Sequence, residues 1–386
     1  MKKYVLIIIF SFIWLASCIV YLPTPQEQRP LPKEEPYYEE DYRAGSYEVG
    51  SSYFYDYLST YGIWVYHSRY GYVWIPEVRM YNWRPYTYGQ WVWTDYGWTW
   101  ISSFEWGWAP FHYGRWGKDN ELGWFWVPGS TWGPAWIVWR SSNLYIGWAP
   151  IPPDVHFIPG IGIHTLPYSL NVYYWIFIDG RYFLNSRIYR YIIPVERNRT
   201  IIYATSLKAR IEVKNDRIIN RALDESFVRS ITKRRITKYS LQDKDKVGPN
   251  KVRVNRVEVF RPTIKTEETA KPKVVLNKEE AKTKISKKKI AIPAEEETPK
   301  ARRALEEGHT HEARILKETQ EKELRELTAS FNRRKKAARN EAEKRKIEET
   351  YKNELTKFKE RHAEEEAQLK QRHKKEKTAK KKIRKF

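Results

Sequence analysis

Histidine is the most versatile chemical side chain in this 386-residue sequence, and only His309 and His311 lie close together along it. Neither a cysteine nor a third histidine stands near that pair, so a zinc-type ligand set is not expected. His362 and His373 fall in a charged segment and are expected to be solvated. The others stand among aromatic residues and are expected to be satisfied structural groups: His67, His112, His156 and His164.

Acidic side chains in an aromatic segment are the second candidate for chemistry. Asp95, Glu105 and Asp119 could supply the acid pair of a glycosidase, but their spacing singles out no two of them. No Gly-rich loop precedes a helix, and no nucleophile elbow or zinc-protease helix is present. The sequence therefore predicts a protein that is not an enzyme and that needs no metal and no cofactor.

Cys18 is the only cysteine, so no internal disulfide can form, and a single cysteine in an exported chain needs an explanation. Before it come Lys2 and Lys3, an apolar run over residues 4–15, and the small residues Ala16 and Ser17. That order is typical of a secretory signal peptide, and the run is shorter than the roughly 20 residues of a membrane span. An uncleaved signal anchor is the alternative.

Leu15-Ala16-Ser17-Cys18 resembles the bacterial lipoprotein box, in which the cysteine becomes the first residue and receives acyl chains. The resemblance implies a signal peptide over residues 1–17, a lipid on Cys18 and a membrane as partner. Ile19 follows the cysteine, so the Asp that retains enterobacterial lipoproteins in the inner membrane is missing. We therefore expect a lipid-anchored cell-envelope protein on the periplasmic side of the outer membrane.

Composition divides the remaining chain into blocks. Residues 18–45 hold five prolines and an acidic patch, which is typical of a disordered, semi-stiff spacer. All of the 18 tryptophans except Trp14 and Trp175 lie between Trp64 and Trp148. Residues 300–386 instead carry 29 Lys and Arg against 17 Asp and Glu. These shifts predict an aromatic module over residues 46–155 and a charged segment over residues 301–386.

The aromatic module contains an internal repeat. A glycine precedes a tryptophan by two residues at Gly62, Gly89 and Gly114, and Trp74, Trp100 and Trp126 follow at intervals of 26 residues. A fixed period of this kind indicates repeated supersecondary units. Because aromatic and β-branched residues alternate between turn signals, each unit predicts a β-hairpin, and the module predicts an antiparallel meander of roughly six to eight strands.

Two interpretations of the tryptophans remain open. The first is a compact aromatic core, since a module of about 100 residues with few leucines needs the area that Trp and Tyr bury. The second is an exposed platform that stacks on glycans. The candidate glycan or partner contacts under the second interpretation are Trp91, Trp93, Trp98, Trp100, Trp106 and Trp108.

The stretch from Trp83 to Trp116 resembles an uncharacterised bacterial family of Trp/Gly/Pro-rich repeat proteins directed to the envelope. The resemblance extends over residues 61–153 and implies a domain of unknown function without a known activity. The chain departs from the family pattern at residues 117–121, which predicts a lengthened loop there.

Residues 156–262 predict a second β-rich region with one short helix. Asp179-Gly180 is expected to turn a strand over residues 172–178 into residues 181–183. Asp224 is expected to cap a helix that runs through Lys233. Further strands are expected over residues 200–205, 210–213, 217–219 and 252–260.

The C-terminal part predicts a disordered linker over residues 263–300 and then one long charged helix with a basic tail over residues 301–386. Apolar residues recur along two stretches of this helix and weaken between them, near Ala338 and Ala342. A single solvated helix and a helix-mediated dimer therefore both remain open. The two stripes consist of Leu324, Leu327 and Phe331, and of Ile347, Tyr351, Leu355 and Phe358.

The expected fold class is mostly β, with repeated antiparallel hairpins, a small α+β region and a long C-terminal charged helix. The expected function is a non-catalytic envelope lipoprotein that acts as a scaffold or tether between the membrane and a wall or surface polymer. Its basic tail, residues 374–385, predicts anionic envelope polymer or lipid head groups as partners. Two alternatives are a glycan-binding lipoprotein that uses exposed Trp and Tyr, and a nucleic-acid-binding protein. Nucleic acid is not expected, because an exported lipoprotein meets no genome.

Overall fold

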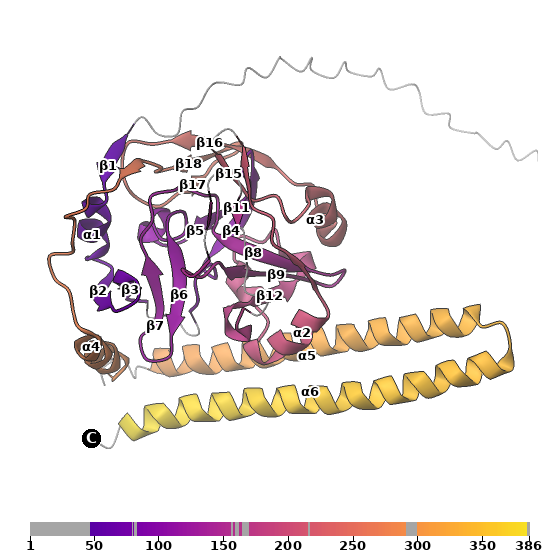
Figure 1. Ribbon diagram of the computed structural model, residues 1–386. Helices are drawn as coiled ribbons and strands as arrows, with labels where there is room; N and C mark the ends of the chain where they lie inside the picture. Colours follow the sequence, from indigo (N-terminus) through magenta and orange to yellow (C-terminus); the bar gives the residue numbers. More distant parts are fainter. Residues whose placement is uncertain are drawn as a thin grey trace, which may run out of the picture. The chain divides into compact units, whose positions relative to one another are not determined.

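The computed structural model describes residues 47–78, 80, 83–155, 157–158, 162–163, 170–214, 217–290 and 299–383 (Figure 1). The expected signal peptide, Cys18 and the spacer lie outside the described residues, as do His156 and His164. Short, mainly antiparallel strands form several open sheets, and long helices follow at the C-terminal end. The predicted fold class, mostly β with a C-terminal helical region, is confirmed.

The first of three larger sheets contains two of the predicted hairpins. Its strand order is β2-β3-β7-β6, and all neighbours are antiparallel. Helix α1 (Ser52–Leu58) packs on this sheet, and the indole nitrogen of Trp74 donates to the Leu58 carbonyl at 2.9 Å. The strands are β2 (Gly62–His67), β3 (Gly71–Pro76), β6 (Arg115–Asp119) and β7 (Gly123–Val127).

The second sheet joins the aromatic module to the chain that follows it. Its order is β17-β18-β16-β4-β5, and β16 runs parallel to both β4 and β18. The blocks predicted at residues 46–155 and 156–262 therefore share a sheet. Its strands are β4 (Gly89–Thr94), β5 (Gly97–Ser102), β16 (Lys238–Asp243), β17 (Lys251–Val252) and β18 (Arg256–Val259).

The third sheet is antiparallel, with the order β12-β9-β8-β13. Its strands are β8 (Ile137–Ser141), β9 (Tyr145–Pro150), β12 (Ile176–Asp179) and β13 (Ser206–Lys208). Three two-stranded pairings complete the strands: β1 (Glu48–Gly50) with β19 (Thr263–Lys265), β10 (Phe157–Ile158) with β11 (Gly162–Ile163), and β14 (Glu212–Lys214) with β15 (Arg217–Ile219).

Each hairpin of the aromatic module carries a cross-strand pair of tryptophans, and β4–β5 carries a second pair, Trp93 with Trp98. The repeat predicted three of these hairpins, and β8–β9 is a fourth that the glycine pattern does not mark. Because the hairpins enter three different sheets, the repeat does not continue as one meander. The facing pairs are Trp64 with Trp74, Trp91 with Trp100, Trp116 with Trp126, and Trp139 with Trp148.

The repeated glycines make room for these tryptophans. A Cβ on Gly62 would lie 2.3 Å from the Ile75 carbonyl oxygen and 2.5 Å from the Trp74 indole nitrogen. Gly89 and Gly114 stand at the same place in their hairpins and meet the same obstruction. At residues 117–121 the predicted long loop is wrong: β6 continues to Asp119, whose carboxylate accepts from the amides of the turn.

The region after the module holds more helix than predicted. Residues 200–205 fall largely in helix α2 (Asn198–Tyr203), and residues 180–182 form a 3₁₀ turn, η3, instead of a second strand. Helix α3 (Glu225–Thr232) begins as predicted, with Asp224 accepting from the amides of Ser226 and Phe227. The other 3₁₀ turns are η1 (Glu105–Trp108), η2 (Val172–Tyr174), η4 (Ile188–Tyr191) and η5 (Val195–Arg197).

Residues 263–300 are more ordered than predicted. They contain β19 and helix α4 (Lys278–Ile290). Asn277 caps this helix, because its side chain accepts from the Glu280 amide at 2.9 Å and the Glu280 carboxylate accepts from the Asn277 amide at 2.8 Å. Residues 291–298 of the predicted linker lie outside the described part.

The predicted single long helix is instead a hairpin of two antiparallel helices, α5 (Pro299–Ala337) and α6 (Glu341–Ile383) (Figure 1). The two apolar stripes face each other within one chain, and the Phe331 and Tyr351 rings stack at 4.1 Å. The turn lies where the apolar pattern weakens, between Ala337 and Glu341. Its Asn340 side chain accepts from the Glu343 amide and so begins α6. Among the described helices, none combines the length and apolar character that crossing a membrane requires.

Candidate functional site

The six tryptophans expected as candidate glycan or partner contacts lie in the core. Trp98, Trp100 and Trp108 are at most 1% exposed, and Trp91, Trp93 and Trp106 at most 9%. The Trp91 ring centroid lies 4.9 Å from that of Trp100 and 4.6 Å from that of Trp139. The core interpretation is confirmed. The platform expectation is corrected, because these rings have no accessible face on which a sugar could stack.

The large aromatic side chains that remain exposed in the described part of the chain are tyrosines. They stand on separate elements and not on one face of a sheet. A glycan would therefore meet single tyrosines and no row of rings. These exposed residues are Tyr47, Tyr66, Tyr173, Tyr189 and Tyr203.

A buried ionic cluster holds the α5–α6 hairpin on the β body. Arg197, at the end of η5, is fully buried and lies 2.5 Å from the Glu323 carboxylate of α5. On the other side it donates to Glu365 of α6 at 2.7 Å. Glu365 also accepts from the Thr200 hydroxyl at 2.7 Å, and Glu323 accepts from the Tyr145 hydroxyl at 2.8 Å. One arginine of the body thus binds both helices of the hairpin.

The pKa values of this cluster favour its charged form. Burial by itself raises the pKa of Glu323, but hydrogen bonding with His362 and the charge of Arg197 lower it to about 2. Burial and the nearby Glu323 charge raise the pKa of Tyr145. Burial opposes the charge of Arg197, yet the two carboxylates and Tyr145 raise its pKa. At neutral pH the Arg197–Glu323 pair is therefore an ion pair.

A second set of ionic contacts lies nearer the open end of the hairpin, where α5 begins and α6 ends. Arg372 of α6 contacts Glu196 of the body at 2.5 Å and Glu312 of α5 at 3.0 Å. His373 lies 2.8 Å from Glu312, and its ring stacks on that of His309 at 3.8 Å. The expectation that His362 and His373 are solvated is therefore wrong, because both lie against carboxylates of the neighbouring helix.

Asp179 supplies a third contact between body and hairpin. Its carboxylate lies 2.8 Å from Lys322 of α5 and is also paired with Arg181. Burial raises the pKa of Asp179, but hydrogen bonds from Arg181 and Lys322 outweigh that effect and lower it. Lys322 of α5 therefore binds the body.

The other residues considered for chemistry are separately engaged. His112 is buried, contacts the Gly133 carbonyl at 2.9 Å through Nδ1, and contacts the Asn250 amide through Nε2. Asp95 pairs with Lys238, Glu105 accepts from Tyr61, and Asp119 holds the β6–β7 turn. Nothing brings the three carboxylates together. Within the described residues no group of three His, Cys, Asp or Glu side chains could hold a metal ion.

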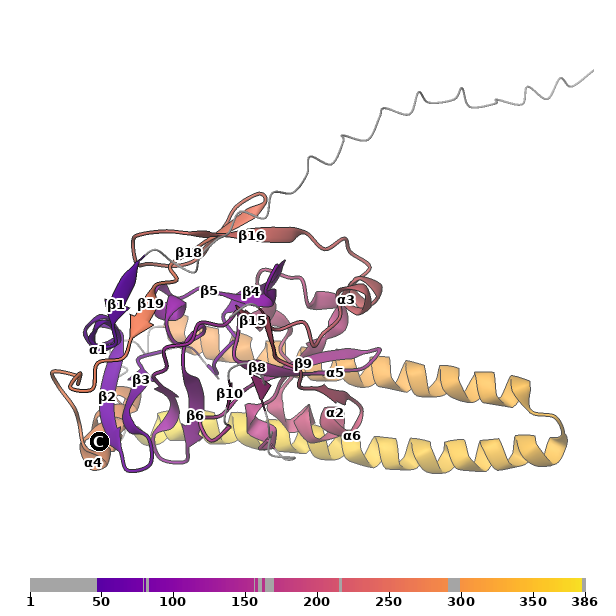
Figure 2. The same ribbon diagram turned by 45° about the horizontal axis from the view of Figure 1, so that its top comes forward.

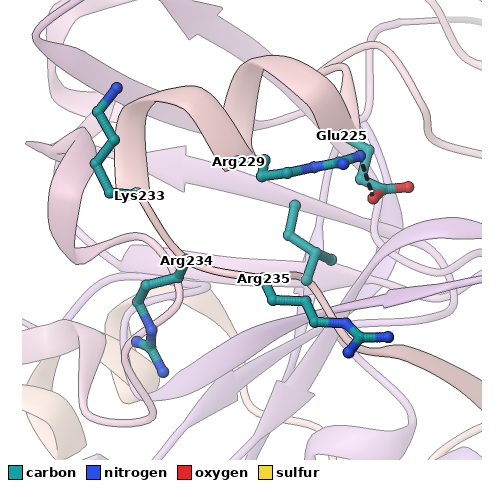
Figure 3. Close-up of a pocket in the computed structure, with 6 residues that line it drawn as sticks. Glu225, Arg229, Lys233, Arg234 and Arg235 are labelled. Carbon is teal, nitrogen blue, oxygen red and sulfur yellow. Dashed lines mark hydrogen bonds and ion pairs between the residues drawn. The ribbon is translucent and has the colours of Figure 1, made fainter. Parts of the chain in front are cut away.

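A basic pocket of about 480 Å³ lies beside α3. Arg229 pairs with Glu225 at 3.1 Å. Figure 3 shows Arg235 on the same side as that pair, whereas Lys233 and Arg234 lie at the opposite end and point apart. Cations that diverge in this way do not enclose one small anion. The lining residues are Glu225, Arg229, Lys233, Arg234, Arg235 and Ile236.

In the comparison with known proteins, one family model matches the aromatic module. Residues 55–155 match the model of a family of unknown function, DUF6600. The match spans the four Trp-paired hairpins and supports an uncharacterised domain there, as the resemblance over residues 61–153 indicated. No curated protein and no solved structure matches the chain. Of the buried ionic cluster, only Tyr145 lies within the matched segment.

Proposed function

We propose that the protein is a lipid-anchored scaffold of the cell envelope that tethers a membrane to a wall or surface polymer. In this proposal Cys18 carries the acyl chains and residues 18–45 act as the spacer. The β body is then the rigid centre, and the α5–α6 hairpin is a basic arm fixed to it. The proposed location is the periplasmic side of the outer membrane.

The observation that carries the proposal is the docking of the hairpin on the body by Arg197, Glu323 and Glu365. Breaking a buried ion pair by removing one partner costs about 3–5 kcal/mol, because a charge is left buried without compensation. A hairpin held in this way keeps a fixed direction relative to the body. A fixed arm suits a protein that spaces or links two structures better than one that opens and closes around a substrate.

The engagement of the acid–base groups supports a non-catalytic function. Glu323 and Glu365 are bound to Arg197, and Asp179 is bound to Lys322 and Arg181. Structural partners thus engage each of these buried carboxylates. The proposed partners are anionic envelope polymer or lipid head groups, in agreement with the net charge of +23.

The test is metabolic labelling with a clickable palmitate analogue, followed by membrane fractionation, on the natural chain and on Cys18→Ala. The proposal predicts label on the natural chain alone, recovered with membranes, and release of Cys18→Ala from that fraction. Equal recovery of both chains in the soluble fraction, with no label, would contradict it. That result would favour the alternative in which the basic surfaces bind nucleic acid.

A further inference from the structure

The distal half of the α5–α6 hairpin leaves the body. Contacts with the body reach Glu323 on α5 and begin again at His362 on α6. Between these points, every hydrogen bond and ion pair that the described residues make stays within the hairpin, as in Arg334 with Glu354. Figures 1 and 2 both show the turn beyond the body. At 1.5 Å per residue, residues 324–337 project about 20 Å.

The end of this arm is strongly basic. Residues 331–349 contain eight Lys and Arg against four Glu. Three of those glutamates are occupied, because Glu341 pairs with Lys344, Glu348 pairs with Lys335, and Glu343 accepts from the Arg339 amide. Five basic side chains are exposed and make no side-chain hydrogen bond or salt bridge among the described residues. They are Arg333, Lys336, Arg339, Arg345 and Lys346, called the hairpin tip below.

The hairpin tip offers charge without apolar surface. Phe331 and Tyr351 stack on each other between the helices. The exposed large apolar residue of the described hairpin, Leu324, lies at the start of the projecting half, far from the turn. A surface of this kind does not insert into hydrocarbon, so its binding is electrostatic. Because it is the convex end of a helical hairpin, its cations spread outward. Cations that spread outward do not enclose a single small anion, and together they match a broad anionic surface.

We propose that the hairpin tip docks on the surface of a bilayer that contains anionic phospholipid. A plane of lipid phosphates meets several spreading cations at once, and each Lys or Arg near such a surface contributes about 1 kcal/mol. The inference deepens the proposed function by naming the part of the protein that contacts lipid head groups. It does not depend on the acyl chains, so the two proposals fail separately.

The test is co-sedimentation of the full chain carrying Cys18→Ala with vesicles at 0.1 M salt. One vesicle preparation contains phosphatidylcholine with 30% phosphatidylglycerol, and the other contains phosphatidylcholine alone. Any affinity of the N-terminal apolar run is common to both preparations and to all variants. The tip variant is Arg333→Gln, Lys336→Gln, Arg339→Gln, Arg345→Gln and Lys346→Gln. A control variant of equal net charge is Arg229→Gln, Lys233→Gln, Arg234→Gln, Arg235→Gln and Lys246→Gln.

The expected result is binding to the anionic vesicles that falls at least about 100-fold in the tip variant and less than about threefold in the control. Binding should also fall steeply as salt rises, because exposed charges are screened. An equal loss in both variants would overturn the proposal in favour of net charge alone. Binding of long-chain polyphosphate through the tip, without binding to anionic vesicles, would overturn it in favour of a soluble polyanion.

Discussion

The guanidinium group of Arg197 donates to the carboxylate of Glu365 at 2.7 Å, although 168 residues of chain separate them. Arg197 has no exposed surface, and the same group contacts Glu323 on the antiparallel helix. One residue of the β body thus contacts both helices of the hairpin.

Replacement of Arg197 by Ala should undock the hairpin. Glu323 and Glu365 would remain at the interface without their cation, at a cost of about 3–5 kcal/mol. Hydrogen exchange of α5 and α6 should rise in Arg197→Ala, while that of β4 and β5 stays unchanged. The matched control is the triple variant Arg197→Met, Glu323→Gln and Glu365→Gln, which removes all three charges and should recover most of the protection. Unchanged exchange in Arg197→Ala would contradict the assignment.

Docking should weaken in acid. The pKa of Glu323 is about 2 in the folded protein, below its usual value near 4.5. A depressed pKa contributes stability that is complete above about pH 4.5 and is lost as the pH falls toward 2. Hydrogen exchange of α5 at pH 4.5, 3.5 and 2.5 measures this loss. The loss of α5 protection between pH 4.5 and 2.5 should be smaller in Glu323→Gln. An identical loss in the two proteins would exclude Glu323 as its source.

His112 should make the β body less stable below neutral pH. Burial, only partly offset by its hydrogen bond with Gly133, lowers its pKa to about 4. The unfolded chain therefore binds the proton more tightly, and stability falls as the pH drops from 6.5 toward 4. Between pH 7 and 5 the loss should be about 2 kcal/mol in urea unfolding. His112→Gln should remove most of this difference, and retention of the full difference would place its origin elsewhere.

The two kinds of glycine in the hairpins should respond differently to substitution. Gly62→Ala forces a Cβ to within 2.3 Å of the Ile75 carbonyl oxygen, so the strand must shift, at a cost of about 1–3 kcal/mol. Gly71 has a φ of +71° but no atom within 4 Å of an added Cβ. Because Asn tolerates that backbone conformation, Gly71→Asn should cost less than about 1 kcal/mol. Equal losses of unfolding free energy would contradict the packing described for Trp74.

The hairpins of the aromatic module were predictable because their signals are local. Glycine, alternating aromatic residues and a turn recur at one period, and the facing pair Trp64 and Trp74 follows from that pattern. The assignment of hairpins to three sheets was not predictable, because β16 enters beside β4 from more than 140 residues away along the chain. Burial of Trp91 and Trp98 has the same origin, since Trp139 and Phe183 from later elements pack against them.

Two missed features left readable signals. Asn277 with Glu280, and Asn340 with Glu343, each place a capping side chain three residues before a glutamate. These signals mark the start of α4 in the predicted linker and the start of α6 inside the predicted single helix. The buried ionic cluster left no local signal in the sequence. Arg197, Glu323 and Glu365 stand far apart in sequence and resemble any other charged residues until the hairpin folds back.

The central claim is that the hairpin is a rigid arm fixed to the β body. Spin labels are attached at Lys336→Cys near the turn and at Tyr203→Cys on α2, in a Cys18→Ala chain. Pulsed electron–electron double resonance then measures the distribution of distances between the two labels, which reports the direction of the arm. One narrow distance distribution is predicted, and it should broaden when Arg197→Ala is added. A broad distribution that is the same with and without Arg197 would contradict the claim.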